Sequence, residues 1–350
     1  MRRVIALIIL SIALLVPAQA ATSIAEANAS STEAGLRMIK DYREKPDPRS
    51  VPQLIRALSE HGAFKDPETS GVYLGFYAGV LSTNPRTAKS LLAKTLPLPF
   101  EDQWFIVRAV AYSGLPNWRA LMLFLVEKMP ERHVMIEMYL NGKLPTLDKV
   151  KLEQERESTW DKMKRVFDRE TYTGEGKKKP PQLTFASNPE LIDTNWGLYF
   201  ATARDAPVEH IVRLLPWSKE RDNVQKLTIG GMAKFTLAAN AARDANLLRT
   251  LKRLSMKQPK DVEPILGEVI IAAETADTGR IRKEALASVD QLQKKGPGSN
   301  RELAWWGQVG ETTLSLGCLG AAVAGQAEFG IPCVVGGALS TAALRYLASP

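Results

Sequence analysis

Helices arranged in closely spaced pairs are the feature that most constrains how this chain can fold. Beyond the N-terminal segment, apolar residues recur with helical spacing, and no convincing run shows the alternation that marks a β-strand. Val51, Leu54, Ile55 and Leu58, for example, fall on one face of a helix. The sequence therefore predicts an all-α fold in which amphipathic helices bury their apolar faces against one another.

Very short turns join these helices in pairs. Asn84-Pro85 and Asp205-Ala206-Pro207 are two such turns, and both contain the proline that often opens a helix. The second helices open near residues 85, 117, 207, 245 and 278, and three of the four steps between them, 32, 38 and 33 residues, are typical of helical-hairpin repeats. The expected pairs are 70–82 with 85–96, 101–113 with 117–129, 190–204 with 207–215, 219–242 with 245–256, and 262–275 with 278–294.

One pair of segments is directly similar. Leu74-Gly75-Phe76-Tyr77 aligns with Trp196-Gly197-Leu198-Tyr199 at an offset of 122 residues, and the same offset pairs Pro85 with Pro207. A unit of two helices cannot bury its own apolar face, so neighbouring units must stack to cover it. The similarity therefore favours an array of repeated hairpins.

These hairpins resemble the tetratricopeptide and HEAT-like α-solenoid repeats over about residues 50–294. The resemblance implies a right-handed array of antiparallel helical hairpins with a concave surface. An irregular all-helical bundle, whose hairpins share turn chemistry by chance, is the alternative.

Two local patterns predict helix starts and helix packing. Ser187-Asn188-Pro189-Glu190 is a capping box with proline in the first turn, so a helix is expected to begin there. Gly71, Gly75 and Gly79 lie four residues apart on one expected helix and leave a face without side chains. Another helix can approach that face closely, and we expect this contact inside a soluble core.

The N-terminus predicts export. Met1-Arg2-Arg3 is a short positive region, Val4–Val16 carries no charge, and Pro17-Ala18-Gln19-Ala20 provides small residues for a signal peptidase. Cleavage after Ala20 would release a periplasmic or extracellular protein. A retained anchor is the alternative, although the apolar run is shorter than the ~20 residues that span a bilayer.

The C-terminus differs from the rest in composition. Thr312–Ala327 and Phe329–Leu344 are two stretches of 16 residues without a charge, and Gly317, Ala321 and Gly325 repeat every four residues on the first. This pattern predicts a close-packed, Gly/Ala-rich helical hairpin. It can cap the array, contact a membrane through residues 312–347, or contact a second subunit.

Both cysteines of the chain lie in this expected hairpin. Cys318 and Cys333 flank its turn, so in an oxidising compartment they are candidates for a disulfide that would stabilise the fold by about 3 kcal/mol. Two cysteines and three histidines cannot supply the usual zinc or iron–sulfur sites. The sequence also lacks the common catalytic, phosphate-binding and dinucleotide motifs, so we expect no catalytic residues, cofactor or metal.

The charge of the chain is only mildly basic. The formal net charge is +8, and loss of Arg2 and Arg3 with the leader lowers it to +6. Such an excess, without a basic stripe, does not predict a nucleic-acid partner.

The expected organisation follows from a break in the repeat spacing. Residues 172–181 contain three consecutive lysines, two glycines and two prolines, which is typical of a mobile surface loop. The expected parts are a signal peptide at 1–20, a flexible leader at 21–30, an N-terminal helical lobe at 31–171, a basic loop at 172–186, a C-terminal repeat lobe at 187–296 and the Gly/Ala-rich hairpin at 297–350.

Together these features favour a non-catalytic, exported scaffold that binds a protein or peptide in the cell envelope. Trp104, Trp118, Tyr199 and Trp217 are candidate aromatic contacts for that partner, although each can equally be a core residue. A glutamate-based peptidoglycan hydrolase remains an alternative because carboxylates on distant helices leave no sequence pattern. A membrane-active effector that inserts its C-terminal hairpin is the other alternative.

Overall fold

A computed structural model of the chain describes residues 32–150 and 189–287, apart from 66, 68–69, 222–223, 282 and 285–286. Throughout these residues the regular elements are α-helices and short 3-10 helices, without a strand, which confirms the all-α prediction. The predicted signal peptide, leader, basic loop and C-terminal hairpin with both cysteines lie outside the described residues.

The N-terminal half covers residues 32–150. Within it, α4 contacts α5 and α6, and α6 in turn contacts α7 and α8, so the contacts largely follow chain order. Helix α3 packs against α5, and α2 packs against α10 of the C-terminal half. The elements are α2 (Thr32–Asp41), α3 (Val51–Glu60), α4 (Gly71–Thr83), α5 (Ala88–Thr95), η2 (Phe100–Asp102), α6 (Gln103–Tyr112), α7 (Trp118–Lys128), η3 (Pro130–Arg132), α8 (His133–Leu140) and η4 (Leu147–Lys149).

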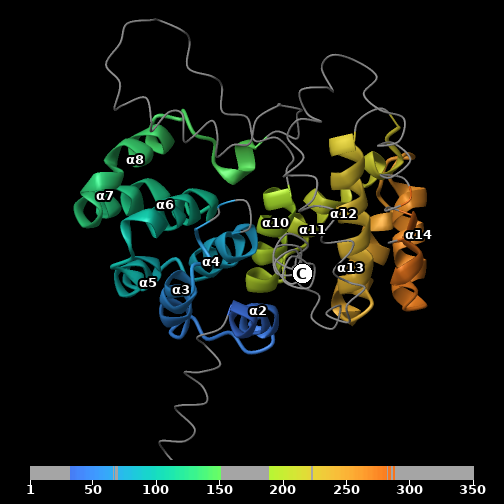
Figure 1. Cartoon of the computed structure of the whole chain (residues 1–350), viewed down its shortest axis with the longest axis horizontal. Helices are drawn as coiled ribbons and strands as arrows, with labels where there is room; N and C mark the ends of the chain where they lie inside the picture. Colours follow the sequence, from blue (N-terminus) through green and yellow to red (C-terminus); the bar gives the residue numbers. More distant parts are fainter. Residues whose placement is uncertain are drawn as a thin grey trace, which may run out of the picture.

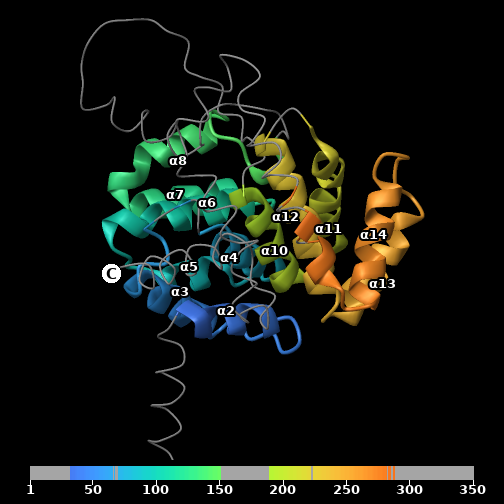
Figure 2. The same cartoon turned by 45° about the vertical axis from the view of Figure 1, so that its right-hand side comes forward.

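The C-terminal half covers residues 189–287 and has a similar contact order. Helix α10 contacts α11 and α12, and α12 contacts α13 and α14. In both views α13 and α14 lie at the outer edge, far from α7 and α8 at the opposite edge (Figures 1 and 2). The elements are α10 (Pro189–Thr202), α11 (Asp205–Val212), η5 (Leu215–Lys219), α12 (Val224–Ala241), α13 (Ala245–Ser255) and α14 (Glu263–Glu274).

Most helix boundaries fall near their predicted positions, and proline explains two differences. The helix expected at 207–215 begins two residues earlier, at Asp205, because Pro207 is tolerated in the first turn of a helix. The helix expected from residue 219 begins at Val224. Pro216 opens the 3-10 helix η5 in front of it instead.

The two halves meet where α4 packs against α10, the most extensive contact between any two described helices. Figure 1 shows α10 between the N-terminal half and α11–α14. The predicted close approach at the glycines of α4 is confirmed. A Cβ atom added at Gly75 would lie 1.9 Å from the Thr194 carbonyl oxygen, and one added at Gly197 would lie 2.1 Å from that of Val72. Glycine is therefore required on both helices.

The residues that meet at this crossing are related by the 122-residue offset. A Cβ at Gly71 would meet the Cβ of Asp193 at 3.0 Å, and one at Gly79 would meet the Cβ of Ala201 at 2.6 Å. Gly75 and Gly197, the third equivalent pair, also face each other. The contacts advance together along both helices, so α4 and α10 run parallel. Two similar helices thus pair as in a symmetric dimer within one chain.

The end of α2 also connects the halves. The Arg43 guanidinium lies 2.6 Å from a carboxylate oxygen of Asp244, the residue before α13, and its Cζ lies 4.9 Å from the ring centre of Tyr199 on α10. The ring of the neighbouring Tyr42 packs edge-on against Phe76 of α4, with 5.0 Å between centroids. One continuous apolar core runs through both halves. None of the helices in the described ranges combines the length and apolar character needed to cross a bilayer.

Candidate functional site

The four aromatic residues expected to contact a partner do not form one surface. Trp104 and Tyr199 are only 2% and 3% exposed, so the alternative, a core position, is what the structure shows for both. The indole nitrogen of Trp104 donates to the Phe64 carbonyl oxygen at 3.3 Å, and the Tyr199 hydroxyl donates to Asp244 Oδ2 at 2.9 Å. Trp118 and Trp217 are half-buried on different halves and pack against the core.

A buried ion pair lies close to the junction of the two halves. The guanidinium of Arg108 on α6 donates to Glu190 in the first turn of α10, and the side chain of Arg108 has no exposed surface. Burial opposes the charge on Arg108, but Glu190 and the oxygens of Tyr112 and Tyr139 outweigh it and raise the pKa of Arg108. The Arg108 Cζ also lies 5.2 Å from the ring centre of Trp104. Because the pair is sealed from solvent, its role is to join helices.

The structure describes only part of the capping box predicted around Glu190. Helix α10 begins at Pro189, as the capping box predicts, but the Glu190 carboxylate is used by Arg108. The expected cap residue, Ser187, lies outside the described residues. Ser50 behaves in a similar way: α3 begins after it, yet its hydroxyl donates to the Asp47 carbonyl oxygen rather than capping the helix.

Asp244 and Glu268 are also committed to structural contacts. Burial alone would raise the pKa of Asp244, but hydrogen bonds from Tyr199 and the backbone, with the Arg43 charge, outweigh it and lower that pKa. Glu268 on α14 pairs with the largely buried Lys234 of α12 and, at 3.2 Å, with Lys219 of η5. These contacts outweigh the effect of burial and lower the pKa of Glu268. Each carboxylate therefore stabilises the packing of neighbouring helices.

We expect His210 on α11 to make the stability of the fold depend on pH. It is half-buried, and its Nδ1 lies 3.2 Å from Asn195 Oδ1, where a neutral ring can donate. Burial, followed by the charge of Arg213, lowers the pKa of His210, and Glu209 only partly offsets this. The unfolded chain therefore binds a proton at a higher pH than the folded chain does, so stability is complete above the unfolded pKa of about 6.5 and falls as the pH drops below it.

We expect urea denaturation to report this loss. The free energy of unfolding should decrease between about pH 7.5 and about pH 5, a range above the titration of ordinary carboxylates. In the variant His210→Gln, which keeps a hydrogen-bonding group near Asn195, the decrease should be smaller. An identical decrease in both proteins would assign the pH dependence to other groups.

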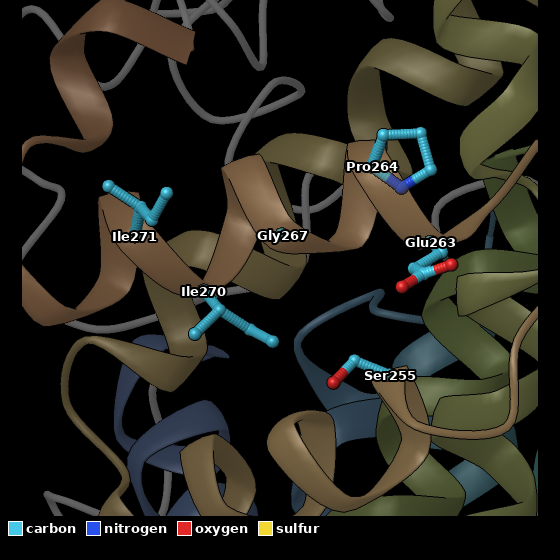
Figure 3. Close-up of a pocket in the computed structure, with 6 residues that line it drawn as sticks. All are labelled: Ser255, Glu263, Pro264, Gly267, Ile270 and Ile271. Carbon is cyan, nitrogen blue, oxygen red and sulfur yellow. The ribbon is translucent and has the colours of Figure 1, made fainter.

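A groove lies at the outer edge of the C-terminal half. It has a volume of about 450 Å³ and lies between α14 and the end of α13. Figure 3 shows Ser255, Glu263 and Ile270 pointing into the space between the two helices. We call it the α14 groove; its lining residues are Ser255, Glu263, Pro264, Gly267, Ile270 and Ile271.

Two features describe the surface of the α14 groove. Ile271 is 57% exposed and the nearby Met256, just after α13, is 78% exposed, so large apolar side chains face solvent here. A Cβ atom added at Gly267 would have no neighbour within 4 Å, which leaves open space along the middle of α14. An apolar side chain of a partner could therefore contact Ile271 without displacing another side chain.

The α14 groove is lined mostly by apolar residues. Its lining offers one carboxylate and one hydroxyl, from Glu263 and Ser255. Among the described residues, no cluster of histidine, cysteine, aspartate or glutamate is arranged to hold a metal ion. The two isoleucines lie beside Gly267, where the helix carries no side chain.

Sequence reasoning missed this groove. Ile270 and Ile271 belong to the apolar run of α14 and look like core residues in the sequence. The one available signal was Gly267, a glycine inside an apolar helix, which often marks a close approach or an open face.

No protein-family model matches the chain, and comparisons with curated proteins and with solved structures give no significant match either.

Proposed function

We propose that this protein is an exported, non-catalytic scaffold that binds a protein or peptide partner through the α14 groove. Its two halves would be short, right-handed sets of helical hairpins, and the signal peptide expected at residues 1–20 would direct it to the periplasm or the exterior. The proposal assigns the partner an apolar segment, because four of the six lining residues are glycine, proline or isoleucine.

The observation that carries this proposal is the contrast between the α14 groove and the charged groups described above. Arg108 and Glu190 are buried and paired with each other, and Asp244 and Glu268 hold helices together. The α14 groove, by contrast, leaves Ile271 accessible to a partner. A folded protein that exposes large apolar side chains beside a groove is expected to cover them in a complex.

The test uses two matched substitutions. Ile271→Lys places a charge in the α14 groove, and Leu123→Lys places the same charge on α7 at the opposite edge, where the side chain is similarly exposed, 60% against 57%. The immobilised mature chain and both variants would be incubated with an envelope extract of the organism that encodes the protein. We expect a stoichiometric partner that is retained by the wild type and Leu123→Lys but reduced at least about tenfold by Ile271→Lys, a loss of about 1.4 kcal/mol in binding.

Circular dichroism and urea denaturation would confirm that both variants fold as the wild type does. Equal recovery of every protein by all three chains would contradict a role for the α14 groove. Release of muropeptides when the mature chain is incubated with peptidoglycan would instead support the hydrolase alternative and remove the scaffold proposal.

A further inference from the structure

We propose that the partner at the α14 groove is a second copy of this chain, and that the two copies pair through antiparallel α14 helices related by a two-fold axis at Gly267. This inference rests on the proposal that the α14 groove is a binding surface, and it names the polypeptide that covers it. In a two-fold pair every contact between two different residues is formed twice, so the surface must be complementary to itself.

Three residues spaced by seven mark the outer face of α14. Lys260, Gly267 and Glu274 lie on nearly the same side, because a step of seven residues changes direction by only about 20° on an α-helix. Lys260 precedes α14, but the Glu263 amide donates to the Pro259 carbonyl oxygen at 3.0 Å, so the helical hydrogen bonding extends back to this turn. Lys260 and Glu274 are both exposed. Opposite charges thus flank Gly267 at similar distances, about 10 Å along the helix axis.

This order of charges selects an antiparallel second copy. Rotation about a two-fold axis at Gly267 brings Glu274 of each copy to Lys260 of the other, whereas a parallel copy would bring like charges together. An acidic segment of another protein would be attracted by Lys260 but repelled by Glu274, and a basic segment would have the opposite conflict. Because exposed ion pairs are weak, these charges set the orientation and the choice of partner more than they supply affinity.

Glu274 can form this contact without losing the one it already has. Its carboxylate lies 2.5 Å from the Lys252 ammonium, and its side chain is still 43% exposed. One carboxylate of α14 already contacts two lysines, since Glu268 pairs with both Lys219 and Lys234. Glu274 can therefore keep Lys252 and also accept from the second copy.

The residues between the charges fit the same register. Pro264 and Ile270 lie three residues before and after Gly267, so Pro264 of one copy meets Ile270 of the other at the α14 groove (Figure 3). The open space at Gly267 allows the helices to approach closely, as α4 and α10 do at their glycines. Ile271, which is 57% exposed, then lies against the methylene stem of Glu263 from the second copy. Each copy thus covers the apolar residues of the other.

The size of this contact predicts a weak dimer. Helix α14 has 12 residues and is therefore about 18 Å long. Stable interfaces bury about 800 Å² on each partner, and one pair of helices of this length covers less. We therefore expect a dissociation constant on the order of 10 µM.

Charge reversal tests the proposed pairing. Sedimentation velocity of the full mature chain, at concentrations from about 1 to about 200 µM, should show a dimer that forms as the concentration rises. Lys260→Glu and Glu274→Lys each place like charges at both ends of the pair, so each should raise the dissociation constant at least about tenfold. The controls Lys128→Glu and Glu127→Lys make the same changes at exposed positions of α7 and should leave the dissociation constant unchanged.

Two combinations of these substitutions restore opposite charges. The double variant Lys260→Glu/Glu274→Lys should dimerise as the wild type does, because both charges are exchanged in each copy. An equimolar mixture of the two single variants should form a heterodimer, although each variant alone is largely monomeric. A wild type that stays monomeric at about 200 µM, a dimer that neither single variant weakens, or a loss that neither combination restores would overturn the proposal. Circular dichroism would confirm that every variant is folded.

The capture experiment with Ile271→Lys separates this inference from the proposed function. If the purified chain is monomeric but retains a different envelope protein in a way that Ile271→Lys abolishes, the inference is wrong and the proposed function stands. If the chain dimerises with the expected response to charge reversal but retains no protein other than itself, the α14 groove serves self-association alone. The inference then stands, and the role as a scaffold for another protein is wrong.

Discussion

Replacing Gly75 with leucine is expected to lower the free energy of unfolding by about 3 kcal/mol or more, at the upper end of what overpacking costs. The reason is the crossing of α4 and α10, where even a Cβ atom would lie 1.9 Å from the Thr194 carbonyl oxygen. That neighbour belongs to the backbone, so it cannot move aside as a flexible side chain can. Gly197→Leu should have a similar effect, because its Cβ would meet the backbone of Val72 at 2.1 Å.

The matched control is Gly267→Ala, a substitution of another helical glycine. No atom lies within 4 Å of the added Cβ, so the change should be neutral or stabilise the protein by about 0.5–1 kcal/mol through helix propensity. Urea denaturation of the variants would give the free energies. A small loss for Gly75→Leu would mean that α4 and α10 do not pack as closely as described.

Removal of one partner of the buried Arg108–Glu190 pair should have the second large effect. Arg108→Met leaves the Glu190 carboxylate, which is 4% exposed, without the positive charge that stabilises it. Loss of one side of a buried ion pair typically lowers the free energy of unfolding by 3–5 kcal/mol, and we expect about that loss here.

The double variant Arg108→Met/Glu190→Leu tests whether the loss comes from the uncompensated charge. Because both charges are then absent, it should be more stable than either single variant, and the double-mutant cycle should give a coupling energy of at least about 1 kcal/mol. Additive losses measured by urea denaturation would contradict a direct role for the pair.

Sequence reasoning predicted the packing role of Gly71, Gly75 and Gly79 but not their partner helix. The 122-residue offset identified α4 and α10 as similar segments, yet repeats usually contact the next unit along the chain. Here the two similar helices pack against each other instead, in parallel. The choice of partner depends on contacts distant in the chain, which periodicity does not encode.

The buried cluster of Trp104, Arg108 and Glu190 and the exposure of Ile271 were harder to predict for a related reason. Trp104 and Arg108 lie one helical turn apart and share a contact, but Glu190, which completes the cluster, is 82 residues beyond Arg108. Aromatic composition alone could not separate the buried Trp104 from the half-buried Trp118. Exposure of Ile271 likewise depends on which element follows α14 in space, and a single helix pattern cannot supply that information.

Site-directed photo-crosslinking at Ile271 tests the central claim, that the α14 groove is a binding surface, most directly. A benzophenone amino acid would replace Ile271 in the full chain, or Leu123 as the control, and irradiated producing cells would be examined by mass spectrometry. The account predicts a defined product between Ile271 and one partner, and little product from Leu123. Products of equal yield from both positions, or none from Ile271, would contradict it.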